Sequence, residues 1–260
     1  MSTADLRSTF LIGDLFSENR IAWHFTSLDR LAVAGAMPTS PVGLTANKET
    51  GTEFFLARRE LGIINIGGAG RVIADGKRFD LGNLDCLYVS MGTREVQFES
   101  NDAKSPAKFY MISCPAHQAF QTSLVKKAET KPVEIGAPAT ANRRSIYQYI
   151  HLGGIRSSQL VMGFTHLQEG SVWNTMPPHT HLRRSEIYFY FDLGPNIVSH
   201  FLGPPQNSRH IWVQNEQAVL SPPWSIHSGC GTAAYKFVWA MAGENQTYDD
   251  MDAAPMAQLR

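Results

Sequence analysis

Cysteine is scarce in this chain and is not arranged in pairs. The 260 residues contain three cysteines, Cys86, Cys114 and Cys230, which lie far apart and form no CxxC motif. An odd number of isolated cysteines argues against a disulfide framework and against a thiolate metal site. We therefore expect a protein from a reducing compartment.

Long hydrophobic runs and an excess of charge of either sign are also missing. No stretch of about 18 apolar residues occurs, and the N-terminal segment MSTADLRSTFLIGDLF has no basic start followed by a long apolar run. The 23 Lys and Arg residues balance the 23 Asp and Glu residues, so the net charge gives no reason to expect a nucleic acid or an anionic membrane as partner. These features predict a cytoplasmic protein. A small anionic ligand needs only local arginines and stays open.

What the sequence does contain is a repeated β pattern. Hydrophobic residues make up 43% and charged residues 18% of the chain, which is enough apolar material for a core. From about residue 50, short apolar or alternating segments are broken by turn residues, as at Asp75-Gly76 and Met91-Gly92. The cluster at residues 67–70 fits a turn and matches no nucleotide-binding motif. An all-β fold follows.

The pattern occurs twice, with a change of character between the two stretches. Residues 115–150 are richer in lysine, proline and small residues, and a short helix is expected to begin at Asn142. We predict an N-terminal barrel with an extension at residues 1–140 and a C-terminal barrel at residues 141–260.

The second stretch contains a pattern typical of a metal site. In an extended strand His179 and His181 point to the same side, and Glu186 is expected to open a new strand after a turn. A proline turn delivers His227 at the start of a later strand. Three imidazoles and one carboxylate suit zinc, iron(II), manganese, nickel or cobalt, with one or two positions left for water or substrate. We predict that these four residues bind one divalent ion on the inner wall of the barrel.

Several sequence blocks carry a more specific resemblance. The HxH, glutamate and histidine pattern resembles the cupin barrels. From about residue 50 to the C-terminus, the chain is similar to the 5-keto-4-deoxyuronate isomerases, also called 4-deoxy-L-threo-5-hexosulose-uronate ketol-isomerases. The blocks that carry this resemblance are RRELGIINIGGAG (residues 58–70), SMGTREVQF, PAKFY, WNTMPPHTHLRRSEIYFYF, RHIWVQNEQAVLSPPWSIHSG and GENQTYDDMD.

The resemblance implies two tandem cupin barrels with few short helices, a zinc ion bound by the four residues named above, a homohexamer and a role in breaking down pectin-derived uronates. The first half of the chain lacks the HxH motif and resembles the metal-free cupin of that family.

The implied substrate, 4-deoxy-L-threo-5-hexosulose uronate, has an aldehyde at C1, a hydroxyl at C2, a ketone at C5 and a carboxylate at C6. Isomerisation to 3-deoxy-D-glycero-2,5-hexodiulosonate moves the carbonyl from C1 to C2, by an enediolate stabilised by the metal or by a hydride shift. The candidates for the proton-transferring base are Glu60, His210 and Glu244, and ion pairs or surface positions are the alternative interpretation for each.

Four further residues are candidates for substrate binding. Arg183 or Arg184 is expected to bind the substrate carboxylate, unless both form surface or intersubunit ion pairs. Tyr188 and Tyr190 share a face with Glu186 and are candidate hydroxyl donors or pocket walls.

The ligand set alone leaves other functions open. An iron(II) cupin dioxygenase uses the same three histidines and glutamate, and a non-catalytic sugar-binding cupin is a second alternative. A phosphosugar isomerase of the cupin type is a third alternative, and it is more closely related to the implied isomerase. Oxygen consumption would identify the first, and turnover that depends on one metal would exclude the second.

Overall fold

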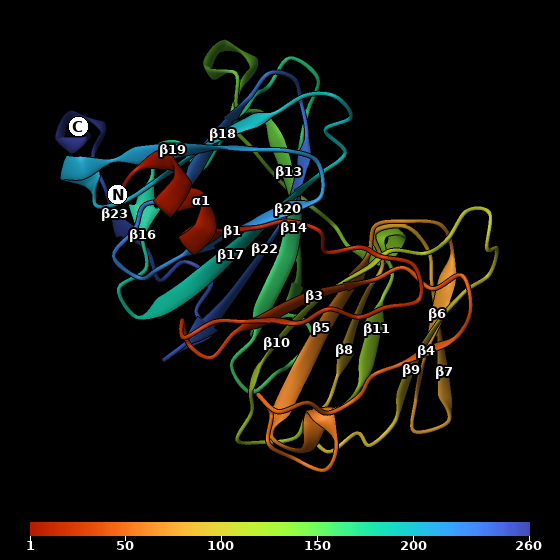
Figure 1. The fold of residues 1–260 in the computed structure, drawn as a ribbon. Coiled ribbons are helices and arrows are strands. Elements are labelled where there is room, and N and C mark those ends of the chain that lie inside the picture. The colour runs from red at the N-terminus through yellow and green to blue at the C-terminus, as the bar shows by residue number, and fades with distance from the viewer. The chain divides into compact units, whose positions relative to one another are not determined.

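The structure, a computed structural model, describes residues 1–260 and consists almost entirely of antiparallel strands (Figure 1). Its one α-helix, α1, spans Thr3–Phe10. No helix has the length and apolar character needed to cross a bilayer. The predicted all-β class with few short helices is confirmed. The 3-10 helices are η1 (Phe55–Ala57), η2 (Lys127–Glu129), η3 (Pro138–Thr140), η4 (Pro205–Asn207) and η5 (Met256–Gln258).

The strands belong to two compact units. Unit 1 consists of Met1–Asp14, Pro132–Gln148 and Met162–Arg260, and unit 2 consists of Leu15–Lys131 and Tyr149–Val161. Each unit thus takes segments that are far apart in the sequence. The division into residues 1–140 and 141–260 stays a prediction.

Unit 2 contains two sheets around an apolar core. Its six-stranded sheet has the order β11 (Ser123–Val125), β8 (Cys86–Val89), β5 (Arg59–Asn65), β10 (Phe109–Pro115), β3 (Ala32–Ala36) and β2 (His24–Phe25). Its four-stranded sheet has the order β4 (Val42–Gly43), β9 (Val96–Ser100), β6 (Gly70–Ala74) and β7 (Lys77–Leu81). The core between them is built from aliphatic and aromatic side chains such as Leu61, Ile63, Val72, Phe98 and Phe109.

One hairpin of unit 2 shows why the turn prediction succeeded. Strands β6 and β7 are joined by Asp75 and Gly76, whose φ angles are 45° and 79°. Positive φ at both central residues is the geometry of the tight type I′ hairpin turn, and an Asp-Gly pair adopts it at low cost. The turn predicted at Asp75-Gly76 is confirmed.

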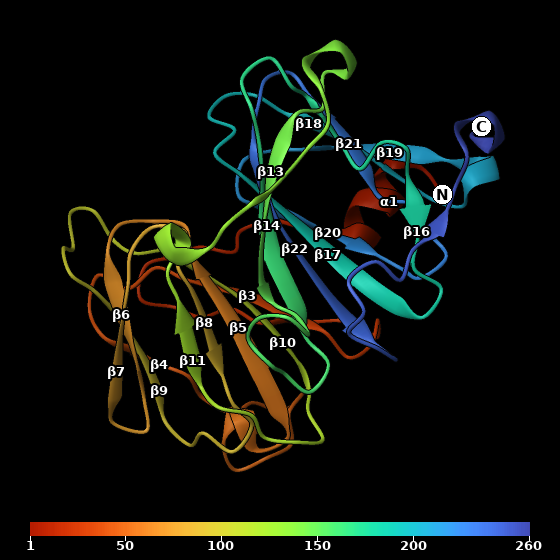
Figure 2. The ribbon, with the colours of Figure 1, turned by 180° about the vertical axis from the view of Figure 1, so that it is seen from behind.

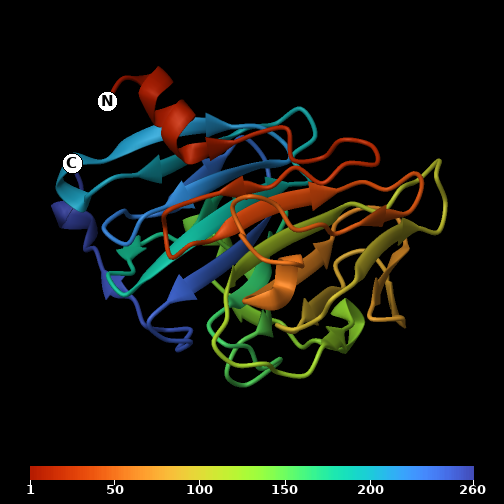
Figure 3. The ribbon, with the colours of Figure 1, turned by 60° about the horizontal axis from the view of Figure 1, so that its bottom comes forward.

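Unit 1 is built on a seven-stranded sheet (Figure 2). Its order is β1 (Leu11–Ile12), β20 (Gln217–Ser221), β17 (Arg184–Phe191), β22 (Lys236–Gly243), β14 (Val161–Leu167), β13 (Arg144–Ile150) and β12 (Val133–Ile135). A four-stranded sheet has the order β15 (Trp173–Asn174), β21 (Ser228–Gly231), β18 (Val198–Leu202) and β19 (Arg209–Val213), and a two-stranded sheet pairs β16 (His179–Thr180) with β23 (Asp252–Ala253). Helix α1 contacts β19 and β20 (Figure 3).

The register of β17 decides which side chains face the interior of unit 1. Across the ladder Glu186 pairs with Met241, Tyr188 with Trp239, and Tyr190 with Phe237. Because successive side chains of a strand point to opposite faces, these three pairs share one face of the sheet. One face of β17 and β22 therefore combines a carboxylate, hydroxyls and large apolar surfaces.

The helix expected at Asn142 is wrong. Residues Arg144–Ile150 form strand β13, which pairs with β12 so that Val133 faces Ile146 and Ile135 faces Arg144. The segment contains the β-branched Ile146 and two tyrosines, which favour a pleated strand with neighbours on both sides. Pairing with neighbouring strands therefore makes this segment a strand.

Candidate metal centre

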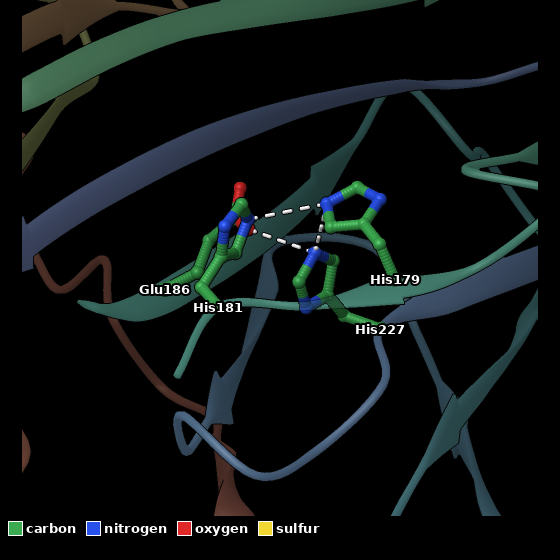
Figure 4. A group of neighbouring side chains, drawn as sticks. All are labelled: His179, His181, Glu186 and His227. Carbon is green, nitrogen blue, oxygen red and sulfur yellow. Dashed lines mark hydrogen bonds and ion pairs between the residues drawn. The ribbon is translucent and has the colours of Figure 1, made fainter. Parts of the chain in front are cut away.

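Four side chains from three places in the sequence converge at one point of unit 1 (Figure 4). His179 lies on β16, and His181 follows just before the turn into β17. Glu186 lies on β17, and His227 immediately precedes β21, after the turn that contains Pro222. The predicted turn between the HxH motif and the strand that carries Glu186 is confirmed.

The ligand atoms of these residues face one another. The Nε2 atom of His179 lies 3.1 Å from Nε2 of His181 and 3.0 Å from Nε2 of His227. Oε2 of Glu186 lies 3.1 Å from Nε2 of His181 and 2.9 Å from Nε2 of His227. All four atoms lie within 4.8 Å of one another.

These separations fit a small divalent cation. Ligand atoms about 2.1 Å from a cation stand roughly 3.0 Å apart when they are 90° neighbours of an octahedron, and roughly 3.4 Å apart in a tetrahedron. The observed short separations match the first arrangement, which leaves coordination positions for other ligands. The group of His179, His181, Glu186 and His227 can thus hold a metal ion.

The surroundings of His179 and Glu186 favour the protonation states in which these side chains bind cations. Burial is the main cause that lowers the pKa of His179 to about 2, and the neighbouring His227 and His181 lower it further. Burial by itself raises the pKa of Glu186, but His227 and His181 outweigh it, and this pKa lies well below its ordinary value. A neutral imidazole and an ionised carboxylate are the protonation states that coordinate metals.

Two of the imidazoles are oriented by hydrogen bonds from the ring nitrogen that faces away from the cluster. Nδ1 of His227 lies 3.1 Å from Oγ of Ser221, and Nδ1 of His181 lies 2.8 Å from the backbone oxygen of Asp250. If each Nδ1 donates its proton to the oxygen, Nε2 is left free to bind a cation, which is the usual outer support of a metal site.

Ser221→Ala is expected to weaken metal affinity about 10- to 100-fold, because it removes the acceptor that orients His227. Titration of metal-free protein with zinc against a competing chelator measures this change. Ser199→Ala, which alters a buried serine of β18, is the matched control. Equal affinities in Ser221→Ala and wild type would contradict the orienting role.

The cluster opens onto a cavity of about 360 Å³ in unit 1, and His179, His181 and Glu186 line it. Apolar walls come from side chains such as Ile135, Ile146, Phe237, Trp239 and Met241. The remaining polar or charged lining consists of Arg144, Gln148, Thr165, Thr175, Tyr188 and Tyr248. Such a mostly apolar pocket with a few convergent polar groups is typical of a small-molecule site.

Glu60 lies in unit 2 with every carboxylate oxygen hydrogen-bonded. Oε1 accepts the backbone N–H groups of Gln159 and Leu160 at 2.9 and 2.8 Å and the Cys114 thiol at 3.5 Å. Oε2 accepts the N–H of Ser158 at 2.7 Å and the hydroxyl of Tyr88 at 2.8 Å. Glu60 forms no ion pair with arginine, so the alternative interpretation given for it in that form is wrong. The catalytic role stays a prediction, but these contacts favour a structural one.

The other two predicted bases are exposed and do not line the cavity. His210 lies on β19, with its ring centroid 5.8 Å from that of Trp212. Glu244 follows β22, and its backbone N–H donates to the oxygen of Arg183. Their catalytic roles also stay predictions.

Arg183 and Arg184 are already engaged. Arg183 forms ion pairs with the carboxylates of Asp250 and Asp252 at 2.5 and 3.0 Å. Arg184 is buried and donates to the backbone oxygens of Thr247 and Asp250 at 2.7 and 2.8 Å. Neither lines the cavity, so these contacts favour a structural role over the predicted carboxylate binding. Both arginines stabilise the segment that contains Asp250, whose backbone oxygen lies within hydrogen-bond distance of His181.

The two tyrosines of β17 have different surroundings. Tyr188 lines the cavity, and its hydroxyl lies 3.0 Å from Oγ1 of Thr175. Tyr190 is fully buried, and its hydroxyl lies 2.7 Å from Nδ1 of His200. Only Tyr188 is placed where a ligand in the cavity would touch it.

His200 gives the protein an acid sensitivity. Burial, with a smaller contribution from His227, lowers the pKa of this fully buried imidazole to about 3. In the unfolded chain a histidine titrates near pH 6.5. Below about pH 6.5 the unfolded chain therefore binds a proton that the folded state does not. The free energy of unfolding has its full value above about pH 6.5 and decreases as the pH falls toward 3.

We expect His200→Gln to flatten the fall of the free energy of unfolding between about pH 6 and pH 4, where one such group changes it by up to about 1.4 kcal/mol per pH unit. Urea unfolding at several pH values measures this. The exposed His117, changed to glutamine, is the control. Identical pH dependence of wild type and His200→Gln would refute the prediction.

Sequence reasoning missed several residues that surround the cluster. Arg144 and Gln148 alternate along β13 and line the cavity, and the period of two in this segment was the available signal. Tyr248 and Asp250 lie in a segment without regular structure. No local pattern identifies their position, because contacts with β16 and β17 create it.

Known proteins resemble the chain in both sequence and fold. The sequence model of the KduI/IolB family matches residues 12–256. The chain is 55% identical to the 4-deoxy-L-threo-5-hexosulose-uronate ketol-isomerase of Opitutus terrae, over 98% of this chain and 93% of that protein. It is 48% identical to the enzyme of the same name from Dickeya dadantii, over 100% of this chain and 95% of that protein.

Solved structures show the same architecture at low sequence identity. An IolB-like protein from Salmonella typhimurium has a TM-score of 0.71 at 14% identity, over 86% of both chains. Oxalate decarboxylase from Bacillus subtilis has a TM-score of 0.57 at 11% identity, over 84% of this chain and 70% of that one. Such likeness shows the fold alone, and it confirms the predicted cupin-type, all-β architecture.

Proposed function

Because the chain belongs to the KduI/IolB family, we propose that it is an aldose–ketose isomerase acting on 4-deoxy-L-threo-5-hexosulose uronate. The product would be 3-deoxy-D-glycero-2,5-hexodiulosonate, in the breakdown of pectin-derived uronates. The observation that carries the proposal is the convergence of four ligand atoms on the wall of a cavity, in a chain whose near full-length relatives are named for this reaction.

The cation is proposed to be zinc, bound by His179, His181, Glu186 and His227. A divalent cation at this place would supply Lewis-acid polarisation of a carbonyl and its neighbouring hydroxyl. Ser221 and the Asp250 backbone orient two of the four side chains that would hold it. Such outer hydrogen bonds fix the orientation of metal-binding imidazoles and raise metal affinity.

The cavity wall has separate tasks for its polar and apolar groups. Phe237, Trp239 and Met241 exclude water from the reacting end of the sugar, which strengthens electrostatic interactions there. Burial raises the pKa of Tyr248 to about 12 and that of Tyr188 well above its ordinary value. Both hydroxyls therefore keep their protons at neutral pH and act as hydrogen-bond donors to substrate oxygens.

We further propose that the protein works in the cytoplasm as a homohexamer, with a small uronate as its ligand and without nucleic acid or membrane as partner. The resemblance to the ketol-isomerases supports this assembly. Light scattering on the purified full chain tests it, and a monodisperse monomer at micromolar concentration would contradict it.

The reaction itself is tested with metal-quantified protein and the uronate substrate. Formation of the 2,5-diketo acid is followed by NMR in deuterated water, where deuterium at C1 identifies proton exchange with solvent and its absence identifies a hydride shift. Turnover should disappear on chelation and return with one metal. Oxygen consumption, or binding without conversion, would instead point to a dioxygenase or a sugar-binding cupin.

A further inference from the structure

Arg144 is the only arginine or lysine that lines the cavity beside the metal cluster. It begins strand β13, opposite Ile135 of β12, on the face that also carries Ile146 and Gln148 into the cavity wall. The neighbouring Arg143 is exposed and does not line the cavity. One positive charge is thus placed inside a pocket whose other walls are largely apolar.

The guanidinium of Arg144 has unused hydrogen-bonding capacity. Its Nη1 donates to the backbone oxygen of Asn142 at 2.7 Å, and it forms no ion pair. Arginine carries five N–H donors in a planar fork, so most of them stay available. Burial lowers the pKa of Arg144, which is the electrostatic cost of holding a cation without a carboxylate partner. An anion in the cavity would offset that cost.

The other arginines near the cluster do not line the cavity. Arg183 already holds two carboxylates, and Arg184 is buried against backbone oxygens. The surroundings of Arg144 suit an anion better, because Gln148 and Tyr248 also line the cavity. An amide and a phenol can add neutral donors to the fork of the guanidinium.

We propose that Arg144 binds the carboxylate of the substrate and is the residue by which the enzyme selects uronates over neutral sugars. This inference rests on the proposed function, since it assigns one end of that substrate. The sugar would lie with its carboxylate on Arg144 and its C1 and C2 oxygens toward His179, His181 and Glu186. A planar fork pairs with a carboxylate through two parallel hydrogen bonds, which gives direction as well as affinity.

The test measures binding of two probes that cannot be isomerised. The first is the substrate reduced at C1 to an alcohol, which keeps the carboxylate, and the second is the same compound with the carboxylate converted to a primary amide. Calorimetry on zinc-loaded protein compares wild type with Arg144→Met, Arg144→Lys and the matched control Arg143→Met. Zinc content and thermal midpoint are measured for each variant to verify folding.

Arg144→Met should weaken binding of the carboxylate probe about 10- to 100-fold and leave the amide probe unchanged. Arg144→Lys keeps the charge but not the planar fork, so its affinity for the carboxylate probe should lie between those of wild type and Arg144→Met. Arg143→Met should bind both probes as wild type does. Equal loss of both probes in a folded variant, or no loss of the carboxylate probe, would overturn the assignment. If wild-type protein fails to convert the uronate, the proposed function is refuted, whatever the relative affinities for the two probes.

Discussion

Replacing His227 with alanine is expected to abolish stoichiometric metal binding and to lower turnover of the uronate about a thousandfold or more. His227 offers one of the four candidate ligand atoms, and its Nε2 lies about as close to Oε2 of Glu186 as to Nε2 of His179. Without it the remaining three ligands leave one side of the site open. A Lewis acid contributes several kcal/mol to such a reaction, and about 4 kcal/mol corresponds to a thousandfold in rate.

Metal content by mass spectrometry and turnover by NMR measure the two effects together. Wild type should hold close to one ion per chain, and His227→Ala close to none. His117→Ala removes an exposed histidine of unit 2 and serves as the control. The same losses are expected for His179→Ala. Near wild-type activity after either change would show that the four residues are not the metal ligands.

Glu60→Gln is expected to destabilise unit 2 by about 3–5 kcal/mol, the cost of breaking a buried charged hydrogen-bond network. The side chain is fully buried, and its two oxygens accept three backbone N–H groups, a tyrosine hydroxyl and a thiol. Glutamine replaces one acceptor oxygen by an NH₂ donor. Whichever way the amide turns, at least one buried N–H group then faces another donor.

Urea unfolding of wild type, Glu60→Gln and the exposed control Glu49→Gln separates structure from catalysis. If Glu60 is structural, the unfolding free energy falls and the folded fraction of Glu60→Gln keeps its turnover number. If it is the general base, as the sequence suggested, turnover falls at least a hundredfold while the unfolding free energy stays near that of wild type.

The four candidate metal ligands could be found in the sequence because local geometry places them. Two histidines two residues apart on an extended strand, followed by a turn and a glutamate on the next strand, need no long-range information to face one another. His227 is further away, but its position after a proline turn and before a strand was a usable signal. The structure brings all four together.

The rest of the site depends on contacts that no local pattern encodes. Arg144 was overlooked because its segment was expected to form a helix, whereas pairing with β12 and β14 makes it a strand. From the sequence alone, Glu60 was a candidate base. In the structure its carboxylate accepts hydrogen bonds from the backbone N–H groups of residues 158–160, about a hundred positions later in the chain. The missed α1 is different, since the capping box of Ser2 and Asp5 was visible.

The pairing of β16 with β23 ties the cluster to the C-terminal part of unit 1. His179 lies opposite Ala253, and the N–H of Ala254 donates to the oxygen of Pro178. Metal binding should therefore slow hydrogen–deuterium exchange of these amides, because opening of the pair would displace a ligand. Isotope labelling at residues 252–254 would report how firmly the ion is held without any substrate present.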